Sequence, residues 1–237
     1  MMQCFSILVF PVIFLSVIFA SNPSSLTIQC DQDNNKVINS SSDSSFQNVH
    51  WIILEKCALE NIPNILSNIP PQVAQVTSLL LRRIKHHPVK SFPNHYQCSP
   101  FLISVSRVKL VGTVGSVSGD YSAVLGYLSQ CTSVIHLEIL DTSLRQVMRL
   151  ESGQTLQSLR LTNNHIAELQ MEDLSALTKL RVLDLARNKL VRIPSRVFTN
   201  NRRLRRLCLA RNSISFITRQ SFLGRIFQIP FFLSDMI

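Results

Sequence analysis

Hydrophobic positions recur every 24 residues in the C-terminal half of the chain. Residues 180–198, LRVLDLARNKLVRIPSRVF, place leucines at 180, 183, 185 and 190 around Asn188. The same frame returns 24 residues upstream and 24 residues downstream. Its members are Leu156, Leu159, Leu161, Asn164 and Ile166 on one side, and Leu204, Leu207, Leu209, Asn212 and Ile214 on the other. A repeat of this length predicts a solenoid, in which each unit buries its apolar face against its neighbours.

The L-x-L spacing inside each unit indicates a short β-strand, because helices need apolar spacings of three and four. Leu183 and Leu185 are therefore expected to point into the core and Asp184 to point outward. The second half of each unit also repeats its apolar residues, with Leu169, Ile193 and Ile217 at one offset and Leu174, Phe198 and Phe222 at another. Successive strands should stack in parallel on one face of a curved ribbon.

The repeat frame becomes less regular towards the N-terminus. Val134, Leu137, Ile139 and Leu144 keep it in a slightly shorter unit, where Thr142 replaces the Asn and still offers a hydroxyl to the backbone. Two further units are longer than the regular repeat, with Val76, Leu79 and Leu81 in one and Val105, Val108 and Leu110 in the other. We predict degenerate repeats over residues 76–133 and clear repeats over residues 134–226.

The pattern LxxLxLxxNxL followed by xxIxxxxF resembles the leucine-rich repeats of extracellular proteins over residues 156–225. Similar repeats occur in the ectodomains of Toll-type receptors and in Slit-like and matrix proteins. The resemblance implies an α/β repeat solenoid, a horseshoe with a parallel β-sheet on its concave face. It also implies that this face recognises a protein or a glycan, but the frame specifies only the scaffold and does not identify the ligand.

The regular asparagines are expected to be structural. Each of Asn164, Asn188 and Asn212 stands where the chain leaves a strand and turns inward, so that backbone N–H and C=O groups need partners there. An amide is both donor and acceptor, so one Asn can satisfy the turns above and below it. Leaving such a group unpaired costs about 1 to 3 kcal/mol.

The first twenty residues, MMQCFSILVFPVIFLSVIFA, contain no charge and are similar to a secretory signal peptide cleaved before Ser21. An uncleaved membrane anchor is the alternative, although Pro11 interrupts a run that is already short for a bilayer. We therefore expect a secreted extracellular protein, or one at the cell surface. Asn39-Ser40-Ser41 is an N-glycosylation acceptor in a Ser-rich stretch that predicts a surface loop.

Five cysteines follow the leader, namely Cys30, Cys57, Cys98, Cys131 and Cys208. Secretion would make them candidates for disulfides, and their odd number leaves the pairing open. The resemblance implies a disulfide-stapled N-terminal cap over residues 21–75, with Cys30 and Cys57 bracketing the segment before IPNILSNIPPQV. Cys98 and Cys131 would then bridge the insertion between them, and Cys208 is left over.

Charge is the clearest functional signal in the sequence. The formal net charge is +10, and residues 179–225 hold 13 of the 24 Lys and Arg against one acidic residue, Asp184. The outward positions of the repeats define a candidate partner-binding set of Arg160, Arg181, Asp184, Arg187, Arg205, Arg206 and Arg211. Either these arginines only keep the domain soluble, or they attract an acidic protein surface or a sulfated glycan.

Nucleic acid is not expected as a partner, because the chain has three Tyr, one Trp and no recognisable base-reading module. Catalysis is also not expected. The cluster GTVGSVSG at residues 112–119 matches no phosphate-binding or nucleophile motif, and His86-His87 has no nearby carboxylate or cysteine. We predict no cofactor and no metal site, since the cysteines lack ligand spacing.

Residues 227–237 are expected to form an atypical tail or a truncated repeat without a terminal cysteine. An uncapped solenoid end exposes apolar surface, which favours self-association. The function predicted from the sequence is therefore a non-catalytic protein that binds another protein or an acidic glycan through its concave face. The alternatives are a shortened ectodomain of a Toll-like or adhesion receptor and, at a distance, an enzyme.

Overall fold

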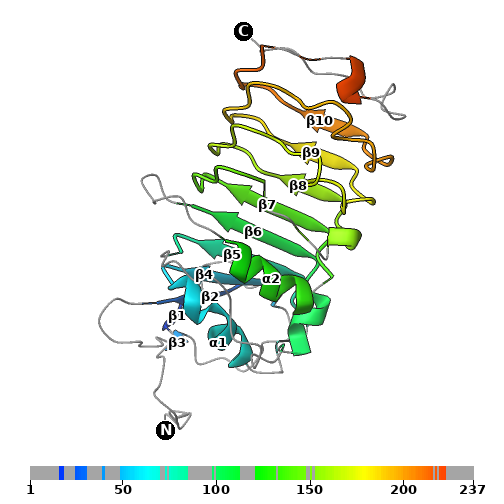
Figure 1. Ribbon diagram of the computed structural model, residues 1–237. Coiled ribbons are helices and arrows are strands. Elements are labelled where there is room, and N and C mark those ends of the chain that lie inside the picture. Colours follow the sequence, from blue (N-terminus) through cyan, green and yellow to red (C-terminus); the bar gives the residue numbers. More distant parts are fainter. Residues whose placement is uncertain are drawn as a thin grey trace, which may run out of the picture.

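The fold is built on one ten-stranded sheet with the strand order β10-β9-β8-β7-β6-β5-β4-β2-β1-β3 (Figure 1). This computed structural model describes residues 16–18, 25–30, 39–40, 49–69, 73, 75–84, 98, 100–112, 121–131, 133–147, 150, 153–215, 217 and 219–222. The strands are β1 (Ser16–Ile18), β2 (Ser25–Gln29), β3 (Asn39–Ser40), β4 (Trp51–Glu55), β5 (Ser78–Arg82), β6 (Arg107–Val111), β7 (His136–Leu140), β8 (Ser158–Arg160), β9 (Val182–Asp184) and β10 (Arg206–Cys208).

The helices lie in the connections between strands, except for the last of them, which follows β10. These are α1 (Ile62–Ser67), α2 (Ser122–Cys131) and the 3₁₀ turns η2 (Leu59–Asn61), η3 (Pro100–Ser104), η4 (Gly153–Thr155) and η5 (Arg219–Phe222). In Figure 1, α1 and α2 lie over the same side of the sheet, in the N-terminal half of the molecule. The C-terminal units replace such helices with turns, for example over residues 195–200.

All strand pairs from β2 to β10 are parallel, and their register keeps the repeat frame aligned. Leu159 pairs with Leu183, which in turn pairs with Leu207. Leu183 and Leu185 are fully buried while Asp184 between them is partly exposed, because side chains alternate faces along a strand. The predicted repeat solenoid with a parallel sheet is confirmed.

The parallel sheet also extends upstream of the predicted repeats, into β2 and β4. One buried position can be followed through every unit, at Leu26, Ile52, Leu79, Val108, Leu137, Leu159, Leu183 and Leu207. The spacing along the chain between successive members is longest on either side of Val108 and shortest between Leu137 and Leu159. The strand register is therefore constant even though the unit length is not.

The N-terminal edge of the sheet contains part of the predicted leader. Residues 16–18 form β1, which pairs antiparallel with β2 and parallel with β3. Asn39, which we expected in a surface loop, instead begins the two-residue strand β3. The difference arises because residues 39–40 find a backbone partner in β1 at the edge of the sheet.

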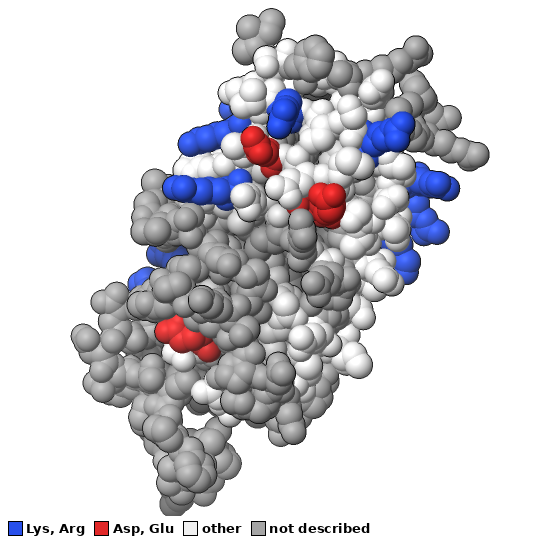
Figure 2. All heavy atoms as spheres, viewed as in Figure 1, with Lys and Arg blue, Asp and Glu red and all other residues white. Residues whose placement is uncertain are grey.

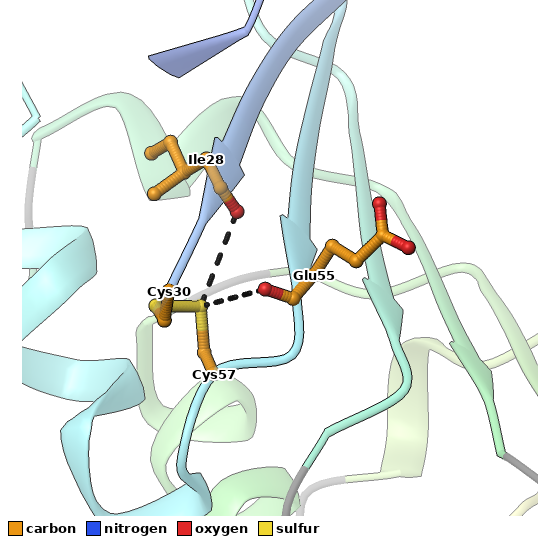
Figure 3. Close-up of a disulfide and its surroundings, with 4 residues drawn as sticks. All are labelled: Ile28, Cys30, Glu55 and Cys57. Carbon is orange, nitrogen blue, oxygen red and sulfur yellow. Dashed lines mark hydrogen bonds between the residues drawn. A yellow bond between two sulfur atoms is a disulfide. The ribbon is translucent and has the colours of Figure 1, made fainter. Parts of the chain in front are cut away.

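Two disulfides staple the N-terminal half. Cys30, directly after β2, is joined to Cys57, two residues after β4, which confirms the predicted disulfide in the cap (Figure 3). The Cys57 sulfur lies 3.5 Å from the Glu55 carbonyl oxygen and 4.0 Å from that of Ile28. Since a disulfide sulfur carries no proton, both are packing contacts. A second disulfide joins Cys98 to Cys131 at the end of α2, and Cys208 is a free thiol.

The amide of Asn188 bridges two successive units. Its Oδ1 accepts the backbone N–H of Ile166 at 3.1 Å, and its Nδ2 donates to the carbonyls of Leu161 at 2.8 Å and Leu185 at 3.0 Å. Asn212 repeats the arrangement with Leu190 and Leu185 one unit further on. We expected contacts to the turns above and below, but each amide bonds its own turn and the preceding unit. The next unit supplies its own Asn, which fills the equivalent place.

Asn164 begins this series and meets Thr142 in the irregular unit. Its Oδ1 accepts the backbone N–H of Thr142 at 3.1 Å, the Thr142 hydroxyl at 2.8 Å and the N–H of Leu144 at 3.1 Å. The Thr142 hydroxyl was expected to bond the backbone, and instead it donates to this side chain. Thr142 is fully buried. Its side chain is shorter than the Asn of the regular units, so it reaches the side-chain amide of Asn164 but not the backbone carbonyls that an Asn would bind.

Gly112 fills a place where no side chain fits. A Cβ on this residue would lie 2.1 Å from the carbonyl oxygen of Asp141 and 2.7 Å from the Cα of Thr142. Its N–H donates to the carbonyl of Leu140 at 2.9 Å, which holds the two units together. The rest of the glycine cluster, His86-His87 and the tail at 227–237 lie outside the described residues.

We expect Asn188→Leu to lower the free energy of unfolding by about 2 to 4 kcal/mol, because it leaves buried backbone groups of two units without partners. Thermal unfolding followed by circular dichroism measures the change. Lys189→Leu is the matched control, since Lys189 is exposed and surface substitutions stay within about 0.5 kcal/mol. Equal melting temperatures for both variants would contradict a structural role for the amide.

Gly112→Ala should cost about 1 to 3 kcal/mol or more, because the new methyl overlaps backbone atoms that cannot move independently. Gly126→Ala tests the same chemical change on α2, where an added Cβ meets nothing within 4 Å. There we expect a gain of about 0.5 to 1 kcal/mol, since Ala favours a helix over Gly. Denaturant titration of both variants measures the difference, and a destabilised Gly126→Ala would contradict it.

Candidate binding surface

The outward side chains of the parallel strands form columns across the concave face. The strands β4, β6 and β7 alternate partly or fully exposed residues with buried ones, so that every second side chain is directed outward. The strand register aligns a first column of Trp51, Ser78, Arg107, His136, Ser158, Val182 and Arg206. A second column contains Ile53, Leu80, Lys109, Glu138, Arg160, Asp184 and Cys208.

In the middle of this face, oppositely charged side chains pair with one another. Glu138 bridges Lys109 at 3.3 Å and Arg160 at 3.0 Å across three neighbouring strands. Such exposed ion pairs contribute roughly 0 to 1 kcal/mol each to stability. Their larger effect is on recognition, because Arg160, which belongs to the predicted binding set, already has a carboxylate partner.

His136 lies beside the Glu138 bridge in the first column. Burial lowers the pKa of His136 below its ordinary value, and the positive charges of Arg107 and Arg160 lower it further. Glu138 opposes this shift as the smallest contribution. The imidazole is therefore neutral at physiological pH and does not add to the basic charge of the face.

Apolar side chains occupy several outward positions in the N-terminal half of the face. Trp51, Ile53 and Leu80 on β4 and β5, together with Val111 and Leu140 at the ends of β6 and β7, are only partly exposed. We call these five residues the apolar patch. Two ion pairs border it, because Glu55 binds Arg82 at 2.9 Å and Arg83 at 3.3 Å. A sheet face that is only solvated carries polar side chains at such positions, so the apolar patch marks a candidate contact surface.

The predicted arginines do not form one cluster. Arg206 lies within β10, and Arg181 and Arg205 directly precede β9 and β10. Arg187 and Arg211 follow the same strands, so they lie at the opposite edge of the sheet. Figure 2 shows Lys and Arg side chains along both edges of the half that carries β8 to β10.

The edge after the strands has a strained backbone at one repeated position. Asn163, Arg187 and Arg211 have φ angles of 57°, 55° and 56°, and Asp141 in the preceding unit has 57°. This left-handed conformation turns the chain away from the sheet, and Asn and Asp tolerate it better than Arg does. The Asn163 amide also donates to the Asp141 carboxylate, which links these two units.

The remaining predicted residue, Asp184, uses its carboxylate locally. Its Oδ1 accepts the backbone N–H of Ala186 at 3.0 Å. Its register partner Cys208 is partly exposed at the end of the second column. Across the described ranges, no group of three His, Cys, Asp or Glu residues is placed to hold a metal ion.

Sequence reasoning picked out Arg160, Asp184 and Arg206, which lie in these columns, but missed the apolar patch. The segment WIILE at 51–55 shows four apolar residues in a row, which hides the two-residue period of β4. In SLLLR at 78–82, Leu80 stands between the two core residues Leu79 and Leu81. The signal was present in the sequence as extra apolar residues in these two segments, because a strand with one buried face needs only every second residue to be apolar.

Comparisons with known proteins agree with this architecture. A sequence model described as leucine rich repeat matches residues 154–214 and 178–224. No curated protein sequence matches the chain. No helix within the described residues has the length and hydropathy needed to cross a lipid bilayer.

Solved structures with a similar fold include TLR13 in a complex with ssRNA13, with a TM-score of 0.52 and 20% identity over 76% of this chain and 27% of that one. Human 5T4, also called trophoblast glycoprotein, has a TM-score of 0.53 and 18% identity, covering 86% of this chain and 74% of that one. Toll in the Drosophila Toll–Spatzle complex has a TM-score of 0.42 and 15% identity, covering 81% and 32%. The chain thus spans about a quarter of the TLR13 structure and a third of the Toll structure.

The repeat frame, the parallel sheet and the family match lead to the same assignment. The matched residues, 154–224, lie where the 24-residue frame is most regular. The two similar folds with TM-scores above 0.5 cover 76% and 86% of the chain. Residues 154–224 match the leucine-rich repeat model, and the chain has the fold of leucine-rich repeat proteins.

Proposed function

We propose that this protein is a secreted or cell-surface leucine-rich repeat protein that binds another protein through its concave face and is not an enzyme. The apolar patch is the observation that carries the proposal. Outward apolar side chains on a sheet face favour a partner that brings apolar side chains of its own. An acidic glycan is the other ligand compatible with the predicted Arg residues of this face.

The charges around the apolar patch support specificity more than affinity. The pairs of Glu55 with Arg82 and Arg83, and of Glu138 with Lys109 and Arg160, give the face alternating signs. A partner must match these signs or lose favourable contacts. Trp51 and Leu80 provide the desolvated contacts that dominate binding energy in most interfaces.

A second candidate is a shortened ectodomain of a Toll-like or adhesion receptor. It is favoured by the similarity in fold to TLR13, whose structure was solved with ssRNA13. For this chain we favour a protein over an RNA as the ligand, because an RNA site would combine aromatic and basic side chains in one place. Trp51 is the only Trp of the sequence, and it lies on β4, far along the sheet from the arginines of β9 and β10.

Leu80→Glu should weaken binding of a partner protein at least about tenfold, because it buries an unpaired carboxylate at the centre of the contact. Partners are first recovered from extracellular medium with the tagged protein, and each affinity is then measured with a biosensor. Met171→Glu is the control, as Met171 is 51% exposed in a turn outside the strands. Equal affinities for the two variants would place the contact elsewhere.

Expression in a secretory host tests the proposed localisation. We expect the protein in the medium with Ser21 at its N-terminus, and therefore without β1, and with an N-glycan on Asn39. Enzymatic removal of N-glycans should then increase its electrophoretic mobility, and Asn39→Gln should abolish that shift. Asn34→Gln, which is not in an acceptor triplet, should keep it. Retention in cells with an intact leader would support a membrane anchor instead.

A further inference from the structure

The strongest charge feature of the molecule lies where β9 and β10 begin. The segment from Asn201 to Leu207 alternates one buried residue with two exposed ones, and all four exposed residues are arginines. The preceding unit has a similar alternation over residues 177–183 and adds Lys179 and Arg181. We call these six residues the basic strip: Lys179, Arg181, Arg202, Arg203, Arg205 and Arg206.

The backbone below the basic strip is fixed. Leu204 and Leu207 are core residues, and Asn201 is fully buried with its amide donating to the carbonyls of Leu174 at 2.9 Å and Leu177 at 3.0 Å. The N–H groups of Arg205 and Arg206 both donate to the carbonyl of Arg181, at 2.8 Å and 3.0 Å. The guanidinium groups of the two units therefore start from adjacent, rigid positions.

Nothing in the described part of the chain neutralises the basic strip. The ion pairs of the described residues all involve Glu55 on β4 or Glu138 on β7, and none of them includes a residue of the basic strip. Asp184, the only acidic residue of 179–225, bonds its own backbone. A surface that is merely solvated intersperses charges of both signs, whereas six adjacent cations repel one another until an anion binds.

We propose that the basic strip binds a linear sulfated glycan, at the edge of the sheet and separately from the apolar patch. This inference rests on the proposed function, in which an acidic glycan is the other candidate ligand, and it assigns that glycan to the basic strip. Guanidinium groups bind sulfate oxygens through paired, charge-assisted hydrogen bonds, which favours Arg over Lys at such a site. Five of the six residues are arginines.

The chemistry of the basic strip favours a glycan over a nucleic acid or a membrane. Proteins that bind single-stranded nucleic acid stack bases on aromatic side chains. Between residues 178 and 211 the only aromatic residue is Phe198, which is 1% exposed. Membrane surfaces are bound by basic residues combined with apolar side chains that insert, whereas Leu180 and Leu204, which lie between the residues of the strip, are buried. A sulfated glycan needs neither feature.

The test uses the full-length protein and size-defined heparin oligosaccharides, with affinity measured by calorimetry at several salt concentrations. The strip variant carries Arg202→Gln, Arg203→Gln, Arg205→Gln and Arg206→Gln. The control variant removes the same charge from the neighbouring unit with Arg187→Gln, Lys189→Gln, Arg192→Gln and Arg196→Gln. All eight residues are exposed, and unfolding temperatures verify that both variants are folded.

We expect the strip variant to bind heparin at least about tenfold more weakly at physiological salt. The slope of log affinity against log salt should also become shallower by about 3, because a protein with fewer cations displaces fewer counterions from heparin when it binds. The control variant should change affinity less than about threefold. Equal weakening of both variants would show that net charge alone acts, and an unchanged strip variant would also overturn the proposal.

Three further ligands identify the class of polyanion and separate this proposal from the proposed protein-binding function. Unsulfated heparosan, single-stranded RNA of matched charge and anionic vesicles should each bind more weakly than heparin. Tighter binding of any of them would overturn the assignment to a sulfated glycan. Leu80→Glu should leave heparin binding intact, so that loss of the protein partner and loss of the glycan are independent results.

Discussion

The structure depends on the requirement that buried backbone groups find partners where the chain leaves each strand. No single unit meets this requirement, because its turn presents carbonyls and N–H groups to the unit beside it. The amides of Asn164, Asn188 and Asn212 connect each unit to the one before it. Stability is therefore shared between neighbours, as in other repeat proteins, and it leaves the outward side chains free to vary.

That division explains which parts of the fold could be predicted from the sequence. The core positions of residues 156–214 repeat at a constant interval, so the period identified them directly. Upstream, β2 and β4 obey the same register at intervals longer than the regular repeat. Their frames carry no Asn, and four consecutive apolar residues disguise β4. Searching the sequence for a fixed period finds only units of equal length. The sheet requires only that neighbouring strands pair in the same register, whatever the length of the connection between them.

The binding surface could be predicted only in part, for a related reason. The arginines are visible in the sequence, but which of them act together depends on where each strand starts and ends. Three residues of β9 separate Arg181 from the edge that carries Arg187. Arg160 was predicted as a binding residue, and its engagement by Glu138 involves a carboxylate 22 residues away. Such pairings across strands follow from register, which no single unit reveals.

The one-sided hydrogen bonding of the asparagines gives the array a direction. Each amide takes its second set of partners from the unit that precedes it in the chain, and Thr142 lies at the start of the series. A ribosome delivers the units in the same order. Each Asn amide therefore meets backbone groups that precede it in the chain, whereas backbone N–H groups such as those of Leu161 and Leu185 find their acceptors only in the following unit.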